Sequence, residues 1–200
     1  MKLFYSPGAC SLSPHIALHE AGLKFDVEKV DMSNKTTSMG DFMKINPKGY
    51  VPALILDNGD VLTEGAVIVQ YIADQKPELK LMAKPGSIER YRTQEWLNFV
   101  STELHKGFGP LFNKTTPEEV KEAAREKLMK RFDFVAKHLE KNHFLMGTQY
   151  TVADGYLFTV MTWAERMKVD LARWPSLMGF LERMKNRPAT HAAMKAEGLL

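Results

Sequence analysis

The feature that most constrains the fold is a division in the sequence pattern. Short β-favouring runs occur only in the first third of the chain, and helical patterns follow. Lys2–Tyr5 is predicted to be a strand, and after a turn the run Ser11–Ala21 carries apolar residues at helical spacing. Phe25, Val27 and Val30 then predict a second strand. Two strands joined by a helix favour parallel pairing, so the chain is expected to begin with a βαβ unit.

A hairpin and a helix are predicted to complete the first domain. The runs Val51–Leu56 and Val61–Leu62 flank Asn58-Gly59, which is a strong signal for a tight hairpin turn. Glu64–Asp74 follows with a helical pattern. The expected order is therefore βαβ, a loop, and ββα, which makes a mixed sheet in an α/β domain.

The remainder of the chain is expected to be all-helical. Residues 75–86 contain prolines and a glycine and show little periodicity, which indicates a linker. We therefore expect domains at residues 1–78 and 87–200, joined by residues 79–86. The helical patterns of the second domain are Ser87–Phe108, Pro117–Lys141, Thr151–Met167 and Pro175–Asn186. The predicted fold class is an α/β domain followed by an all-α helical bundle.

Composition argues against several classes of protein. Apolar residues make up 44% and charged residues 26% of the chain, as in ordinary globular proteins. The 27 basic and 24 acidic residues are mixed along the sequence, so no nucleic-acid surface is expected. No signal peptide is recognised and no apolar run approaches the roughly 20 residues of a membrane span, so a cytoplasmic location without a membrane partner is expected. A single cysteine cannot form an internal disulfide or a Cys-rich metal site, and no metal is expected.

That cysteine, Cys10, is a candidate nucleophile. It follows the first strand and its turn, at the expected start of a helix, where free N–H groups and the helix dipole favour a thiolate. Cys10 and Ser13 form a C-x-x-S pattern, in which serine takes the place of a resolving thiol. Chemistry with an external thiol is the expected use. The alternative is a small buried cysteine without a reactive role.

Two further segments predict a site for a peptide-like ligand. A cis bond at Val51-Pro52 would let the backbone of Val51 pair with a peptide as an added strand does, although the sequence alone favours an ordinary trans proline. At the start of the next helix, Glu64 can pair with an ammonium group, and Gly65 lets a carboxylate approach the helix N–H groups. Together the last two would hold an α-amino acid head group; helix capping is the alternative.

A polar stripe is predicted on the first helix of the second domain. Asn98, Thr102 and His105 fall at positions i, i+4 and i+7 and are expected to share one face. His105 can hydrogen-bond a sulfur or act as acid or base, because imidazole ordinarily titrates near neutrality. A surface histidine without a role is the alternative.

These segments together resemble the glutathione transferases, and among them the bacterial beta class, over essentially all 200 residues. The residues that carry the resemblance are Lys2–Ser11, Asn46–Leu54, Thr63–Gly65, Glu95–Phe99 and Thr102–Lys106. The resemblance implies a thioredoxin-like first domain that binds glutathione, a helical second domain that holds a hydrophobic electrophile, and a homodimer.

The resemblance also implies roles for individual residues. Cys10 faces the glutathione sulfur with His105 beside it, and these two are the catalytic candidates. The residues implied to bind glutathione are Ala9, Lys35, Val51, Pro52, Glu64, Gly65, Asn98 and Glu103. Of these, Lys35 reaches the glycyl carboxylate, and Asn98 and Glu103 reach into the site of the partner subunit.

The expected function is a transferase that conjugates reduced glutathione, as co-substrate, to electrophiles in detoxification, with thiol-transfer or peroxidase side activity. Phe108, Phe112 and Trp163 are candidates for the apolar wall of the electrophile site. One alternative is a glutaredoxin-like thiol transferase or reductase that uses Cys10 as its nucleophile. Another is a non-catalytic ligand-binding protein of the same fold.

Overall fold

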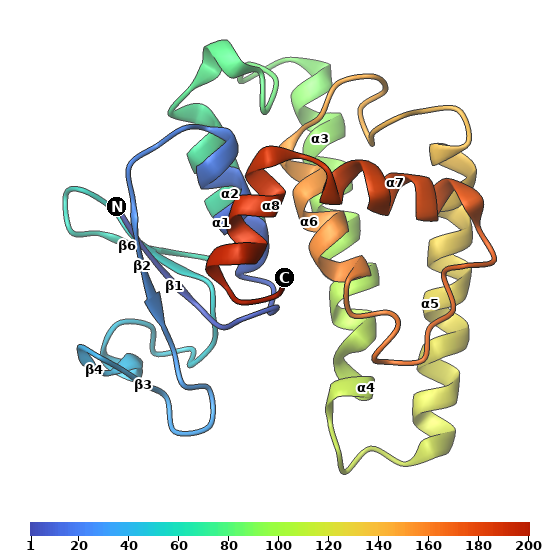
Figure 1. Cartoon of the computed structure of the whole chain (residues 1–200), viewed down its shortest axis with the longest axis horizontal. Coiled ribbons are helices and arrows are strands. Elements are labelled where there is room, and N and C mark those ends of the chain that lie inside the picture. Colours follow the sequence, from blue (N-terminus) through green and yellow to red (C-terminus); the bar gives the residue numbers. More distant parts are fainter. The chain divides into compact units, whose positions relative to one another are not determined.

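The computed structural model describes all residues from 1 to 200 (Figure 1). The chain forms two compact units. The first contains Met1–Met82 together with Asn186–Leu200, and the second contains Ala83–Lys185. The domain boundaries expected from the sequence, 1–78 and 87–200, stay a prediction, but the last fifteen residues belong by their contacts to the first compact unit.

The first unit is built on a four-stranded mixed sheet in the order β2-β1-β5-β6. β1 (Lys2–Tyr5) pairs in parallel with β2 (Asp26–Lys29) and antiparallel with β5 (Ala53–Ile55), which in turn pairs antiparallel with β6 (Val61–Thr63). This is the expected βαβ and ββα order. The parallel pair exists because a helix carries the chain back between β1 and β2.

Three helices pack together in this unit. α1 (Leu12–Glu20) contacts both α2 (Gly65–Asp74) and α8 (Pro188–Ala196), and Figure 1 shows α8 beside α1. α1 is buried along seven of its nine residues because it has neighbours on several sides. A helix at α8 was not among the sequence predictions. Its available signal was Pro188 at the first helical position, where a missing N–H costs nothing.

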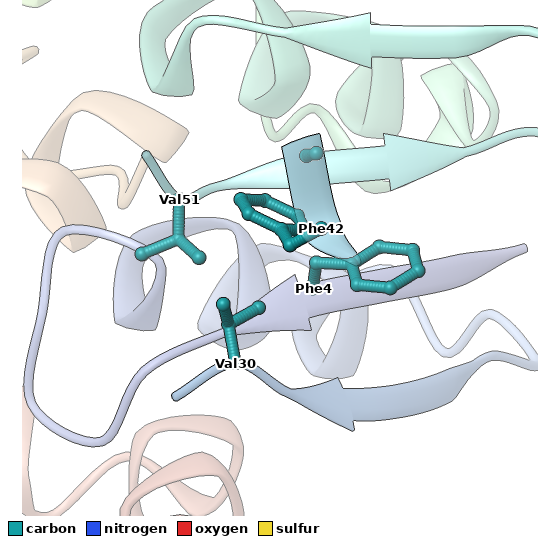
Figure 2. Packing of buried hydrophobic residues seen from close by; sticks show 5 residues of the cluster. Phe4, Val30, Phe42 and Val51 are labelled. Carbon is teal, nitrogen blue, oxygen red and sulfur yellow. The ribbon is translucent and has the colours of Figure 1, made fainter. Parts of the chain in front are cut away.

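An apolar cluster covers part of the sheet. Phe4, Val30, Phe42, Val51 and Ala53 are buried together, and Figure 2 shows the labelled side chains gathered against the strands. The rings of Phe4 and Phe42 lie 5.6 Å apart between centroids. Phe42 begins the short helix η1 (Phe42–Lys44), which follows a small sheet of β3 (Thr36–Thr37) and β4 (Gly40–Asp41). The expected loop before β5 therefore contributes to the core.

The second unit is helical, as predicted. Its elements are α3 (Ile88–Phe99), the π-helix η3 (Val100–His105), η4 (Lys106–Phe108), α4 (Gly109–Phe112), α5 (Glu118–Leu139), α6 (Val152–Met161) and α7 (Pro175–Lys185). The short helix η2 (Pro77–Leu79) belongs to the first unit, and its last residue is the first residue of the expected linker. Nowhere does a helix combine the length and apolar character needed to cross a membrane.

One sequence prediction in this unit is wrong in detail. The run Ser87–Phe108 was expected to be one α-helix, but it is α3 followed by a π-helical and then a 3-10 segment. π-helical turns bond residue i to i+5 and are frequent at functional sites. The wider turn changes the direction in which residues after 100 face.

A capping box between Thr151 and Asp154 begins α6. The Asp154 carboxylate accepts hydrogen bonds from the Thr151 backbone N–H at 2.8 Å and from the Thr151 hydroxyl at 3.0 Å. It also accepts from the Leu145 backbone N–H at 2.7 Å. Because Asp154 is fully buried, these bonds replace the water that its charge loses on folding.

Candidate functional site

Cys10 lies in the turn between β1 and α1, two residues before the helix begins. The residue is half-buried, and its thiol donates a hydrogen bond to the carbonyl oxygen of Val51 at 3.2 Å. Ala9 lies in the same turn, and its backbone N–H donates a hydrogen bond to the carbonyl of Ser6 at 3.0 Å. The structure thus brings together Cys10 and Val51, which lie 41 residues apart in the sequence.

The segment before β5 holds the Val51 backbone in place. Asn46 is 1% exposed, and its side-chain amide donates to the carbonyl of Tyr50 at 2.7 Å. Gly49 adopts φ +70, which favours glycine, and a Cβ there would lie 2.9 Å from the sulfur of Met43. The Val51-Pro52 bond is cis, so the preference for a trans bond drawn from the sequence is wrong here.

Glu64 and Gly65 lie at the start of α2, as predicted. Glu64 is the N-cap residue and has φ +69 and ψ 111, a conformation that costs a non-glycine residue about 1–3 kcal/mol. Such strain is found most often at ligand sites. A Cβ on Gly65 would be 3.7 Å from Pro52, which is ordinary contact, so the protein's own packing does not require glycine there. The absence of a side chain leaves the first-turn N–H groups of α2 approachable.

Two residues of this site were missed by the sequence reasoning. Lys48 lies 2.5 Å from a carboxylate oxygen of Glu64, and the Tyr50 hydroxyl donates to the same oxygen at 3.0 Å. The hydrogen bond to Glu64 raises the pKa of Lys48. The pKa of Tyr50 is raised mainly by burial and, to a smaller extent, by its hydrogen bond to Glu64. Glu64 therefore already binds an ammonium group. Both residues lie inside the segment Asn46–Leu54, which carries the family resemblance. Their position in that segment was the signal that could have identified them as site residues.

Lys35 lies in the turn between β2 and β3. It adopts φ +60, its N–H donates to the carbonyl of Asp31, and its carbonyl accepts from the N–H of Phe42, both at 2.8 Å. These backbone bonds fix the main chain at Lys35, which is half-buried. No group of three or more His, Cys, Asp or Glu side chains is arranged to hold a metal ion.

His105 ends the π-helical segment of the second unit. Its Nδ1 lies 2.7 Å from the hydroxyl of Tyr156, and its ring packs edge-on to Trp163 at 5.0 Å between centroids. Burial, with a smaller contribution from the charge of Lys106, lowers the pKa of His105 to about 4. The expectation that this imidazole titrates near neutrality is therefore wrong. His105 is a neutral hydrogen-bonding group at pH 7.

The π-helical segment also alters the predicted polar stripe. Asn98 is exposed and its carbonyl accepts from the hydroxyl of Thr102 at 3.0 Å, whereas His105 is half-buried. Glu103 is held by Arg131, with 2.7 Å between Nε and Oε2. Asn98 and Thr102 thus stay at the surface while the wider turn directs His105 inward among aromatic rings.

An aromatic cluster surrounds His105. Phe108 and Phe112 each pack edge-on to Trp163, with centroids 5.6 Å and 5.3 Å apart. Phe108 and Trp163 are buried, while Phe112 is 40% exposed and faces the guanidinium of Arg166 at 5.8 Å. Of the three predicted wall residues, Phe112 is the one open to a ligand.

A separate groove of about 670 Å³ lies between α3 and α5. It is lined by Arg92, Glu95, Trp96, Phe99, Arg131, Phe134 and His138. Trp96 packs against Phe134 at 5.7 Å and against His138 at 4.8 Å between centroids, and Phe134 is 54% exposed. An aromatic floor with charged side chains at its rim is typical of an interaction surface.

Comparison with known proteins identifies the family. The glutathione S-transferase N-terminal domain matches residues 8–75, and the glutathione S-transferase C-terminal domain matches residues 99–188. Glutathione S-transferase GstA of Escherichia coli O157:H7 is 49% identical over 200 residues, which cover 100% of both chains. The chain belongs to the glutathione S-transferase family.

Solved structures of glutathione S-transferases have the same fold. A sphingomonad glutathione S-transferase complexed with glutathione is 45% identical, and the bacterial beta class glutathione S-transferase of Sphingomonas chungbukensis is 44% identical. Each comparison covers 100% of both chains with a TM-score of 0.97. The predicted family, the thioredoxin-like and helical fold class, and the enzyme class of this glutathione S-transferase are therefore confirmed.

The buried imidazole predicts a specific acid sensitivity. The pKa of His105 is about 4 in the folded protein and about 6.5 when unperturbed, so the unfolded chain binds the proton first as pH falls. Stability is therefore lost between pH 6.5 and pH 4, by at most about 3.4 kcal/mol at about 1.36 kcal/mol per pKa unit. We expect His105→Gln to lose less free energy of unfolding than the parent protein between pH 7 and pH 4.5, measured by urea denaturation.

The matched control is His143→Gln, which changes an exposed histidine of the same unit. It should leave the pH dependence of the parent protein unchanged. Identical pH slopes for the parent and the His105→Gln protein would contradict the burial of a neutral imidazole.

Proposed function

We propose that this glutathione S-transferase conjugates reduced glutathione to hydrophobic electrophiles in the cytoplasm, as a detoxifying enzyme. The observation that carries the proposal is the cluster at the ends of the central strands β1 and β5 and at the start of α2. There the Cys10 thiol meets the Val51 carbonyl, and Gly65 stands beside Pro52. Retention on immobilised glutathione, followed by turnover with an aryl halide, tests binding and catalysis in turn.

We assign the γ-glutamyl head of glutathione to Glu64 and Gly65. A carboxylate on the ligand would meet the first-turn N–H groups of α2, and its ammonium group would meet the Glu64 carboxylate. In the structure the ammonium group of Lys48 forms an ion pair with the Glu64 carboxylate. This pair supports the assignment, because it is the kind of contact that the ligand's ammonium group would make. The ligand would have to displace or share this exposed lysine. The Val51 backbone would pair with the cysteinyl unit, and Lys35 would reach the glycyl carboxylate.

Loss of the Glu64 carboxylate should weaken binding more than chemistry. In Glu64→Ala we expect the KM for glutathione to rise more than about tenfold, because one charged hydrogen bond contributes about 1.5–3 kcal/mol. The kcat should change much less, since the head group is remote from the reacting sulfur. Steady-state kinetics with glutathione varied checks both quantities.

Lys48→Met is the matched control for Glu64→Ala. It also breaks the Lys48–Glu64 pair but leaves the carboxylate available to a ligand. The KM for glutathione should not rise in this variant. A tenfold rise in both variants would show that the pair supports the local structure and that Glu64 does not bind the ligand.

At the sulfur we assign separate roles to Cys10 and His105. In conjugation the attacking sulfur belongs to glutathione, and its thiolate needs hydrogen-bond donors that stabilise the charge. His105 is neutral, and a Tyr156 hydroxyl that donates to Nδ1 leaves the ring proton on Nε2 as such a donor. Cys10 contributes a thiol whose present acceptor is the Val51 carbonyl. The electrophile would lie against the apolar wall that includes Phe112.

Thiol transfer is the second candidate function. The half-exposed Cys10 favours it, because this sulfur can attack a glutathione mixed disulfide and release the other thiol. Peroxidase activity would be a further side reaction of the same glutathione thiolate. A purely ligand-binding role would make no use of the thiol beside the Val51 carbonyl.

A Cys10→Ala variant separates these two activities. Thiol transfer from a glutathione mixed disulfide should be abolished, because the chain has no second cysteine to replace the nucleophile. Conjugation of an aryl halide should retain substantial turnover, and glutathione retention should stay nearly intact. Undiminished thiol transfer in this variant would show that Cys10 is a structural residue.

We further propose that the enzyme is a homodimer and that the α3–α5 groove receives a second copy. Phe134 of the groove is exposed while Trp96 and Phe99 are half-buried, and the neighbouring surface of α3 carries further exposed apolar side chains, Ile88 and Tyr91. The polar candidates Asn98 and Glu103 follow on the same stretch of chain. A second copy on this face would cover the exposed apolar side chains. It would also place Asn98 and Glu103 near the partner's glutathione site, as the resemblance implies.

Charge on the groove floor should dissociate the dimer. In Phe134→Glu we expect a monomer in sedimentation velocity, because an unpaired carboxylate on a buried apolar surface is costly. Val120→Glu is the control, since Val120 is also exposed on α5 but lies outside the groove. Asn98→Ala should remain a dimer yet bind glutathione more weakly. A dimeric, fully active Phe134→Glu protein would contradict the proposal.

A further inference from the structure

The connection between α6 and α7 begins with a turn that is tied to α5. Figure 1 shows this connection running from the end of α6 across to α5. The turn is closed by the backbone N–H of Met167, which donates to the carbonyls of Trp163 and Ala164, both at 3.1 Å. From α5, Nε of Arg125 donates to the carbonyl of Met167 at 3.2 Å. The backbone of the turn therefore has a fixed place beside α5.

Two side chains of this turn meet Phe112 of α4. Trp163 packs edge-on to Phe112 with 5.3 Å between ring centroids, and the guanidinium carbon of Arg166 lies 5.8 Å from the centroid of the same ring. Phe112 is 40% exposed, whereas Trp163 is 5% exposed. The ring of Phe112 thus rests on a buried aromatic group, presents part of its surface to solvent, and has a cation beside it.

The charge of Arg166 is available to a ligand. Arg166 is exposed and forms no ion pair in the structure. Its contact with an exposed ring contributes only weakly to stability. Three other arginines of this unit each bind a glutamate carboxylate at 2.6 to 2.8 Å: Arg92, Arg125 and Arg131. The charge of Lys106 also acts on this aromatic cluster, since it contributes to the low pKa of His105, whose ring packs against Trp163.

We propose that Arg166 makes this wall selective for aromatic electrophiles that carry a carboxylate. The ring of the electrophile lies on the exposed part of Phe112, and its carboxylate pairs with the guanidinium, whose planar fork matches two oxygens. The inference deepens the proposed function and rests on it, because Phe112 is assigned there to the electrophile wall.

Arg166 acts through binding and takes no part in the bond-making step. Glutathione reacts as the thiolate, after its proton has passed to solvent. With an aryl chloride, the sulfur forms a bond to the ring carbon, and chloride leaves with the electron pair of the broken carbon–chlorine bond. The carboxylate of the electrophile is unchanged by this reaction, so its pairing with Arg166 affects which substrate is held and not which bonds change.

Two aryl chlorides that differ in charge test the inference. 1-Chloro-2,4-dinitrobenzene is neutral, and 4-chloro-3,5-dinitrobenzoate carries a carboxylate on a ring activated in the same way. In Arg166→Gln we expect kcat/KM for the benzoate to fall about three- to tenfold, because an ion pair with its charged hydrogen bonds is lost. The value for the neutral chloride should change much less, since its ring gains nothing from the charge. Arg166→Lys keeps the charge and should retain part of the preference.

Arg173→Gln is the matched control. The guanidinium of Arg173 is likewise exposed and lies 5.0 Å from an aromatic ring, that of Trp174, next to the start of α7. Trp174 donates a hydrogen bond to the Asp133 carboxylate at 3.3 Å. Loss of this charge should leave kcat/KM for both chlorides at the parental values. An equal loss for the benzoate in both glutamine variants would show that net charge, and not Arg166, sets the preference.

The outcomes separate this inference from the proposed function. Equal losses for the two chlorides in Arg166→Gln, or no loss for either, would overturn the inference and leave the proposed function intact. A parent protein that turns over neither chloride would contradict the proposed function. Equilibrium dialysis with 3,5-dinitrobenzoate, which has no leaving group, then decides the inference by binding alone. A dissociation constant raised only in Arg166→Gln supports it, and equal constants in the parent and both glutamine variants overturn it.

Discussion

Burial of β1 on both faces is the constraint on which the rest of the first unit depends. Leu3 and Phe4 are both fully buried although they point to opposite faces of the strand, and β1 also pairs along both edges. Each such side chain contributes roughly 1.5–3 kcal/mol of hydrophobic free energy. A strand held on four sides ends at a fixed point, and the loop to Cys10 starts from that point. The position of the thiol is thus set by the core before any ligand binds.

The site around this fixed point is assembled from backbone groups as much as from side chains. Asn46 shapes the turn that presents the Val51 carbonyl, and the start of α2 presents N–H groups beside Gly65. Backbone donors and acceptors cannot move independently of the fold, so they suit the recognition of a peptide ligand such as glutathione. The strained conformation of Glu64 belongs to the same arrangement, since it turns the chain into α2 while its carboxylate meets Lys48.

The helical unit contributes a different kind of group. The π-helical segment brings His105 into an aromatic surrounding, where burial keeps the imidazole neutral. A neutral ring carries one N–H, so it is suited to donate a hydrogen bond and poorly suited to exchange protons at pH 7. In the proposed reaction, the neutral imidazole of His105 therefore favours stabilisation of an existing thiolate over general acid–base catalysis. The exposed groove between α3 and α5 is a separate feature, which the proposal assigns to a second copy.

The sequence by itself determined the order of elements, because periodicity and turn residues are local. The βαβ and ββα units, the helical second part and the Thr151–Asp154 cap all follow from neighbours within a few positions. The tertiary structure decided what depends on distant partners. The π-helical turn at His105 and its low pKa arise from packing, the Lys48–Glu64 pair from a turn meeting a helix, and the Glu197–Gly8 bond from chain ends 189 residues apart. No local pattern encodes these contacts, because burial and hydrogen bonding between distant residues exist only once the chain has folded.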